Sequence, residues 1–130
     1  MEKRIVLVDD EPAALRVLVR AVKPLAQAGG IPNESFDDPL LATARITQLL
    51  QQQVVVFLVT DFNMPSMTGL QLIQAVRGRE SYHRQCQAVV FSADSGGRNR
   101  TDVVAAGEKF LDKLTDQPAI LNLVREFIAS

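Results

Sequence analysis

Residues 54–61 of the 130-residue chain read VVVFLVTD, an unbroken apolar run that ends in a threonine and an aspartate. β-Branched and aromatic residues without polar alternation are typical of a strand that is covered on both faces. The run is far shorter than the roughly 20 residues needed to cross a bilayer. It therefore predicts a buried strand with Asp61 directly at its carboxyl end.

The same pattern recurs on both sides of this segment. Residues 4–8 (RIVLV) lead into Asp9 and Asp10, and residues 88–91 (AVVF) lead into Ser92. Five strands are expected in total: 4–8, 31–36, 54–59, 88–91 and 110–111. The segment 31–36 is short and interrupted by Pro32 and Asn33, which favours a place at the edge of the sheet.

Segments with apolar residues at helical spacing separate the strands. Five helices are expected: from Pro12 toward the Gly29–Gly30 pair, from Pro39 to Leu50 with an aspartate at 37 or 38 as its cap, near 70–77, near 99–106, and a last helix that includes Ile120 to Ile128. Strands that alternate with helices predict an α/β fold with a parallel sheet and helices on both faces.

The composition indicates one globular domain over residues 1–130. Apolar residues make up 47% of the chain and charged residues 22%, and the formal net charge is −1. This balance gives no overall field for nucleic acid or an anionic membrane, so direct binding to either is not expected. A single cysteine, Cys86, allows no internal disulfide, and we expect a cytoplasmic protein.

Polar residues gather where the strands end. Ligands of parallel sheets bind outside the carboxyl ends of the strands, where Asp9, Asp10, Asp61, Ser92 and Lys113 are expected to converge. Carboxylates held together repel one another unless a cation neutralises them. An all-oxygen set without a histidine and cysteine cluster favours Mg²⁺ over zinc.

This set of residues predicts phosphoryl chemistry. A carboxylate such as that of Asp61 can act as a nucleophile and form an aspartyl phosphate. The Ser92 hydroxyl and the Lys113 ammonium would stabilise charge on the incoming phosphoryl oxygens.

In this order, the residues resemble the receiver domains of two-component response regulators, including the stand-alone chemotaxis regulator. The resemblance runs through nearly the whole chain: Asp9 and Asp10 match the acidic pair, Asp61 in DFNMP the phosphoacceptor, Ser92 the hydroxyl and Lys113 the lysine, and Gly69 follows the acceptor. It implies a flavodoxin-like, doubly wound five-stranded sheet in the order 2-1-3-4-5.

The resemblance also implies roles for particular residues. Asp10, Asp61 and the backbone carbonyl of Asn63 would bind Mg²⁺, and Asp9 would act through metal-bound water. Phe110 matches the switch aromatic of the family.

One position departs from the family pattern. Leu114 follows Lys113, where the family usually has a proline, often after a cis bond. A cis bond without proline costs roughly 2.5–4 kcal/mol, so the Lys113–Leu114 bond is either trans or held in an unfavourable geometry by packing.

The resemblance implies a signalling switch in a two-component phosphorelay and not a turnover enzyme, since such a domain catalyses only its own phosphorylation and dephosphorylation. A histidine kinase or phosphotransfer protein would phosphorylate Asp61. Ser92 would then move inward, shift the loop at residues 94–97 and let Phe110 change rotamer. This would alter a partner-binding face made by the helix near 99–106, the strand at 110–111 and the last helix, toward an output domain or effector. Arg98 and Arg100 are expected to be solvated on this face.

Two alternatives remain at this point. A Mg²⁺-dependent phosphatase with an aspartate nucleophile would need a general acid two residues after Asp61, where the chain has Asn63. An interaction module that has lost phosphorylation is disfavoured because acceptor, acidic pair, hydroxyl and lysine are all present, but Leu114 keeps it open.

Overall fold

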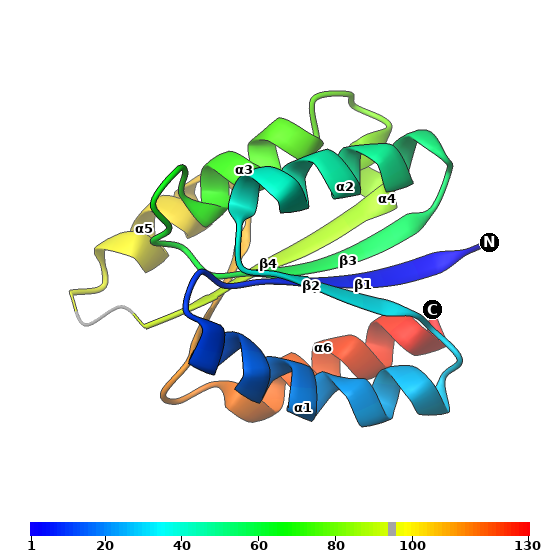
Figure 1. The fold of residues 1–130 in the computed structure, drawn as a ribbon. Coiled ribbons are helices and arrows are strands. Elements are labelled where there is room, and N and C mark those ends of the chain that lie inside the picture. The colour runs from blue at the N-terminus through cyan, green and yellow to red at the C-terminus, as the bar shows by residue number, and fades with distance from the viewer. Residues whose placement is uncertain (94–95) are drawn as a thin grey trace.

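In the computed structural model, which describes residues 1–93 and 96–130, five parallel strands lie between two layers of helices (Figure 1). The strands are β1 (Lys3–Val8), β2 (Asn33–Phe36), β3 (Val55–Thr60), β4 (Cys86–Ser92) and β5 (Lys109–Asp112). The helices are α1 (Pro12–Ala28), α2 (Pro39–Gln51), α3 (Gly69–Val76), α4 (Tyr82–Gln85), α5 (Arg98–Ala105) and α6 (Gln117–Ala129). The sheet order is β2-β1-β3-β4-β5, so the expected fold class and strand order are confirmed.

The described residues contain six helices, and the expectation of five was wrong by the short helix α4. Residues 82–85 form a single turn, closed by bonds from Tyr82 N to Arg79 O (3.0 Å) and from His83 N to Glu80 O (3.1 Å). One turn is too short to show helical periodicity in a polar segment. Strand β4 likewise begins at Cys86, two residues before the apolar run at 88–91.

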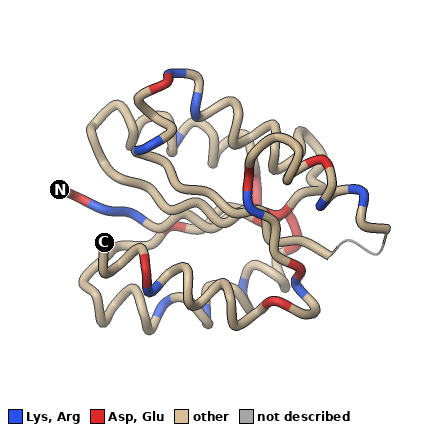
Figure 2. The backbone as a smooth tube through the Cα atoms, turned by 180° about the vertical axis from the view of Figure 1, so that it is seen from behind, with Lys and Arg blue, Asp and Glu red and all other residues tan. Residues whose placement is uncertain are grey.

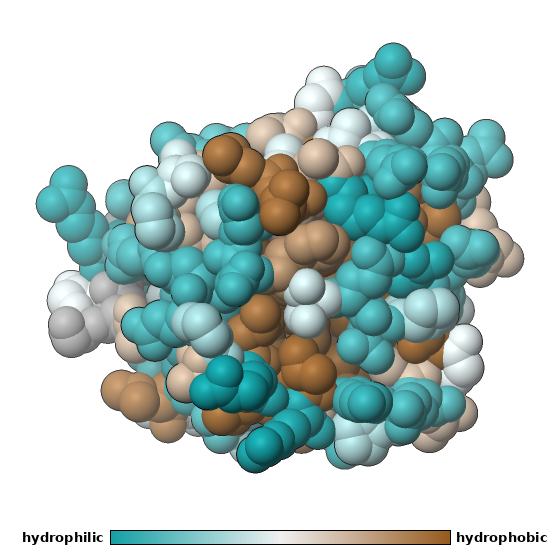
Figure 3. Space-filling model, viewed as in Figure 1, coloured by the Kyte–Doolittle hydropathy of each residue, from teal (hydrophilic) through white to brown (hydrophobic). Residues whose placement is uncertain are grey.

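Both faces of the sheet are buried, which explains the unbroken apolar runs. Alternate strand residues point to opposite faces. Val6, Val8, Val56 and Leu58 pack under α2, α3 and α5 in one cluster. Ile5, Leu7, Phe57 and Val59 pack against α1 and α6 in the other. Figure 3 shows the side of the molecule at the β2 edge, where an apolar band runs between polar regions.

The N-terminal strand fastens the C-terminal helix. Lys3 Nζ donates to the carbonyl oxygens of Phe127 (2.9 Å) and Ser130 (2.5 Å), which lie at the end of α6. Phe127 also stacks on Phe57 of the central strand, with ring centroids 5.4 Å apart. The two termini therefore lie at the same end of the sheet (Figure 1).

No helix in residues 1–93 or 96–130 combines the length and the apolar character that a membrane crossing requires.

Candidate functional site

Three carboxylates meet at the carboxyl edge of the sheet. β1 and β3 are in register with Val8 opposite Thr60, so the next residues, Asp9 and Asp61, leave adjacent strand ends together. Asp9, Asp10 and Asp61 each offer a carboxylate oxygen within 4.8 Å of the others. Asp9 is 2% exposed and Asp61 9% exposed, whereas Asp10 is half-buried. Figure 2 shows acidic positions gathered at this edge, away from both termini.

The Asp61 residue is held on every side. Its N–H donates to Val8 O (2.9 Å), and its carbonyl oxygen accepts from the buried Thr60 hydroxyl (2.9 Å). Its side-chain Oδ1 accepts from Phe62 N (2.8 Å) and from the Ser92 hydroxyl (2.5 Å). The carboxylate is therefore fixed through Oδ1, and Oδ2 faces the Lys113 ammonium. Sequence reasoning missed Thr60, although a threonine directly before the aspartate is visible in the sequence.

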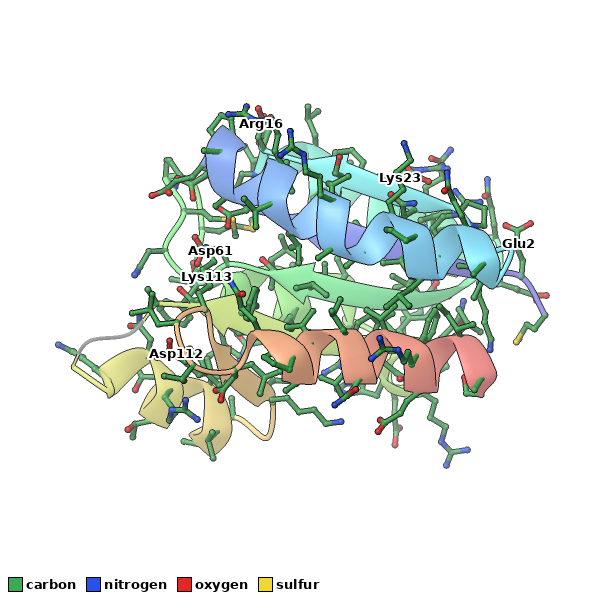
Figure 4. The ribbon with its side chains drawn as sticks, turned by 90° about the horizontal axis from the view of Figure 1, so that it is seen from below. Glu2, Arg16, Lys23, Asp61, Asp112 and Lys113 are labelled. Atoms are coloured by element: carbon green, nitrogen blue, oxygen red, sulfur yellow. The ribbon has the colours of Figure 1, made fainter. Side chains whose placement is uncertain are left out.

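Lys113 directly follows the edge strand β5 and reaches the same carboxylates from there. Its Nζ donates to Asp9 Oδ2 (2.6 Å) and lies 3.5 Å from Asp61 Oδ2 (Figure 4). Burial lowers the pKa of this ammonium, but the hydrogen bond to Asp9 and the charge of Asp61 outweigh burial, so the pKa is raised. The described residues contain no cis peptide bond, so the Lys113–Leu114 bond is trans. A proline is not required to bring Lys113 to the site.

Asp9 has an opposed electrostatic environment. Burial raises the pKa of its carboxyl group, and the negative charge of Asp61 raises it further. The hydrogen bonds from Lys113 and from Glu11 N (3.0 Å) lower it but do not outweigh burial. The pKa of Asp9 is therefore raised mainly because its carboxylate is buried.

The donor set fits a divalent cation with a preference for oxygen. The three side chains that meet are all carboxylates, and Mg²⁺ is bound by one or two carboxylates together with waters and phosphate oxygens. The acidic cluster supports the expected Mg²⁺ site. Asn63 is exposed in the loop after Asp61, and its role as a carbonyl ligand stays a prediction.

Gly69 closes the loop that follows Asp61. Its N–H donates to Phe62 O (2.8 Å), and a Cβ at this position would lie 2.1 Å from Asp61 O. Helix α3 starts here with a capping box, in which Thr68 and Gln71 each bond the backbone of the other. Only a glycine lets the start of α3 approach the backbone of Asp61 this closely.

Phe110 lies inside the apolar cluster under α2, α3 and α5 and is 5% exposed. The Arg100 guanidinium lies over its ring, 4.8 Å from the centroid, and is 3.6 Å from Asp116 Oδ2. Arg100 is exposed, as expected, and it also links α5 to the aromatic ring and to the β5–α6 loop. Sequence reasoning missed this contact because the three residues come from separate elements. The expected movement of residues 94–95 lies outside the described residues.

A groove of about 400 Å³ opens between α1 and α6 beside the acidic site. Its walls are mostly apolar, and Asp9 and Lys113 lie at its edge. The lining includes Ala14, Val17 and Ala21 of α1, and Pro118 and Leu121 of α6. Val17 is 59% exposed, so an apolar surface continues from the groove onto α1.

The chain is similar to proteins of one family. The model of the response regulator receiver domain matches residues 5–125. No curated protein matches the chain. A response regulator receiver protein from Pseudomonas putida is 26% identical, with a TM-score of 0.71 over 97% of this chain and 98% of that chain. Chemotaxis protein CheY4 from Vibrio cholerae (20% identity, TM-score 0.71, 97% and 98% covered) and a response regulator receiver protein from Burkholderia phymatum (16%, 0.72, 98% and 96%) share the fold.

Proposed function

Because the chain belongs to the family of response regulator receiver domains, we propose that it accepts a phosphoryl group on Asp61 as a two-component signalling switch. The observation that carries the proposal is the convergence of Ser92 and Lys113 on the two oxygens of one buried aspartate. Ser92 donates to Oδ1 at 2.5 Å, and Lys113 Nζ lies 3.5 Å from Oδ2. This arrangement provides a nucleophile together with two groups that stabilise phosphoryl oxygens.

We assign the nucleophile to Asp61 Oδ2, since Oδ1 already accepts two hydrogen bonds. In transfer from a phosphohistidine, Oδ2 forms a bond to phosphorus while the phosphorus–nitrogen bond breaks. The electron pair of that bond stays on the imidazole of the donor, whose other ring nitrogen carries a proton, so that the ring leaves as the neutral base. Lys113 then stabilises the phosphoryl oxygens, and the Ser92 hydroxyl is free to turn from Oδ1 to one of them.

Asp10 and Asp61 would hold Mg²⁺ through their side chains and Asn63 through its backbone carbonyl, while Asp9 would act through water on the metal. Bound there, the ion supplies charge neutralisation for the carboxylates and the transferring group. The convergence of three carboxylates at one point supports this assignment.

The phosphorylated state would act through Phe110. Ser92 lies at the end of β4 opposite Asp112 of β5, so a shift of Ser92 toward the phosphoryl group reaches the strand that carries Phe110. Phe110 is buried under Arg100, and turning its ring would release Arg100 from its face. The surface formed by α5, β5 and α6 would thereby change for an output domain or effector.

The proposed phosphodonor is a histidine kinase or phosphotransfer protein. α1 carries three basic residues, Arg16, Arg20 and Lys23, and no acidic residue, and these three form no ion pair within the described part of the chain. Arg16 and Arg20 lie beside Ser35 and Asp37, on the opposite side of α1 from the groove, and this basic surface favours a donor with an acidic face. Reversing the charge of Arg16 and Arg20 should slow transfer from a phosphotransfer protein that phosphorylates the wild type, without slowing transfer from acetyl phosphate.

The central test is incubation with acetyl phosphate and Mg²⁺, followed by intact-mass measurement. Wild type should gain the mass of one phosphoryl group, and Asp61→Ala should gain none. Removal of Mg²⁺ with a chelator should abolish the gain. Absence of an adduct on wild type would reject phosphoryl acceptance and favour a phosphorylation-independent interaction module, whereas an adduct on Asp61→Ala would move the acceptor elsewhere.

A further inference from the structure

The turn between β5 and α6 is closed by three hydrogen bonds around Lys113. Asp112 Oδ1 accepts from Leu114 N (2.7 Å), and Asp112 O accepts from Asp116 N (2.8 Å). Asp116 Oδ2 accepts in turn from Asp112 N (2.9 Å). Lys113 N itself donates to Ser92 O at 3.2 Å. The backbone on both sides of the lysine is therefore fixed by the two aspartates, and its own N–H is fixed by β4.

The side chain of Asp116 does not cap the helix that follows it. Asp116 is the N-cap residue of α6, where an aspartate ordinarily accepts from the N–H of the second or third helical residue. Its side chain makes no such bond, and its carboxylate turns back to Asp112 N instead. The usual contribution of the cap to the helix is thus given up for a bond that closes the turn.

We propose that Asp112 and Asp116 are positioning residues for Lys113, and that their hydrogen bonds replace the proline that usually follows this lysine in the family. The proposal rests on the proposed function, in which Lys113 stabilises the phosphoryl group. The ammonium of a lysine lies at the end of a four-carbon stem of limited reach, so the position of the backbone determines which carboxylates it can contact. Here that backbone place brings Nζ to Asp9 Oδ2, in a turn with a trans bond before Leu114. In Figure 4, Asp112 lies at the end of β5, directly before Lys113.

The first test follows the Lys113 ammonium by ¹⁵N NMR without any phosphodonor. The chain has four lysines, and the signal of Lys113 is assigned by its loss in Lys113→Gln. Asp112→Ala should shift or broaden this signal, because the turn loses the acceptor of Leu114 N. Asp112→Asn retains an acceptor oxygen and should leave the signal near its wild-type position.

The second test measures phosphorylation by acetyl phosphate at saturating Mg²⁺ and donor. Asp112→Ala should react about three- to tenfold more slowly, the factor of one net hydrogen bond, and Asp112→Asn should recover most of the rate. Asp38→Ala is the matched control, since Asp38 makes the same kind of bond to Leu40 N (2.9 Å) and, within residues 1–93 and 96–130, has no hydrogen bond to a site residue. It should lower the melting temperature without moving the Lys113 signal or the rate.

The two tests separate the inference from the function on which it rests. A wild type that takes no phosphoryl group rejects the function, while the NMR comparison still decides the role of the turn. Wild-type signal and rate in Asp112→Ala would overturn the inference. If that variant does not fold, Asp116→Ala, which removes the acceptor of Asp112 N, decides by the same readouts, and unchanged values would again reject the proposal.

Discussion

Replacing Gly69 with alanine should damage the acceptor site through its backbone. The added Cβ would lie 2.1 Å from Asp61 O, and contacts of this kind are essentially never below 3.0 Å, so the two must separate by about 1 Å. The obstacle is a backbone carbonyl that also accepts from the Thr60 hydroxyl, so it cannot rotate away as a side chain could. We expect a loss of about 1–3 kcal/mol in the free energy of unfolding, as in other overpacked sites.

The same displacement should slow phosphorylation. A 1 Å misplacement of a reacting group costs about a hundredfold in rate, so we expect Gly69→Ala to react with acetyl phosphate about a hundredfold more slowly. Gly78→Ala is the control, because its Cβ would meet nothing closer than Ala75 O at 3.6 Å and its φ is not positive. It should be neutral or slightly stabilising.

Urea unfolding and the rate of adduct formation by intact mass measure the two effects. A Gly69→Ala protein with the stability and rate of Gly78→Ala would show that α3 can move away from Asp61 freely. The close approach at Gly69 would then have no part in holding the acceptor.

Three further predictions concern groups outside the acceptor. Arg77 binds both carboxylate oxygens of Glu108 (2.6 and 2.5 Å), and the two side chains are 10% and 14% exposed. Arg77→Met should therefore lower the free energy of unfolding by about 3–5 kcal/mol. If the double variant Arg77→Met, Glu108→Gln lost as much stability as the sum of the two single variants, the two residues would not be coupled. Burial raises the pKa of the Cys86 thiol to about 11. A disulfide reagent at pH 8 should therefore label Cys86 in the urea-unfolded protein and leave it unlabelled in the native protein. Rapid labelling of the native protein would contradict the burial of Cys86. The hydrogen bond from Arg45 holds the pKa of Glu34 below its ordinary 4.5. This pair therefore stabilises the fold above pH 4.5 and loses its effect as the pH falls through the lower folded-state pKa. The free energies of unfolding of wild type and Glu34→Gln should converge in acid, and a difference that stays constant with pH would refute the linkage.

The sequence predicts the sheet and the gathering of polar residues at its carboxyl edge well, because both depend on local patterns. Apolar runs define strands covered on both faces, and the polar residue after each run must lie at the carboxyl edge of a parallel sheet. Asp9, Asp61 and Ser92 follow from these two facts. Lys113 follows too, but the sequence could not decide the geometry of its bond to Leu114.

The remaining features depend on contacts that no local pattern records. An arginine in a predicted helix is typical of an exposed position, and only the folded chain brings Arg100 over Phe110 and beside Asp116. The Asp112 turn was missed for a different reason. An aspartate before a helix predicts a cap, and here the carboxylate of Asp116 bonds backward to Asp112 instead.

The layer formed by α1 and α6 joins the first and last helices of the chain, and this has a consequence for synthesis on the ribosome. Ile120, Val124 and Phe127 of α6 cover apolar strand residues made much earlier, including Ile5 and Phe57. The opposite layer can close once β5 has emerged, but this one cannot close before α6 has emerged. A nascent chain halted before residue 117 would expose the part of this apolar sheet face that α1 does not cover, the kind of surface that chaperones bind and that drives aggregation.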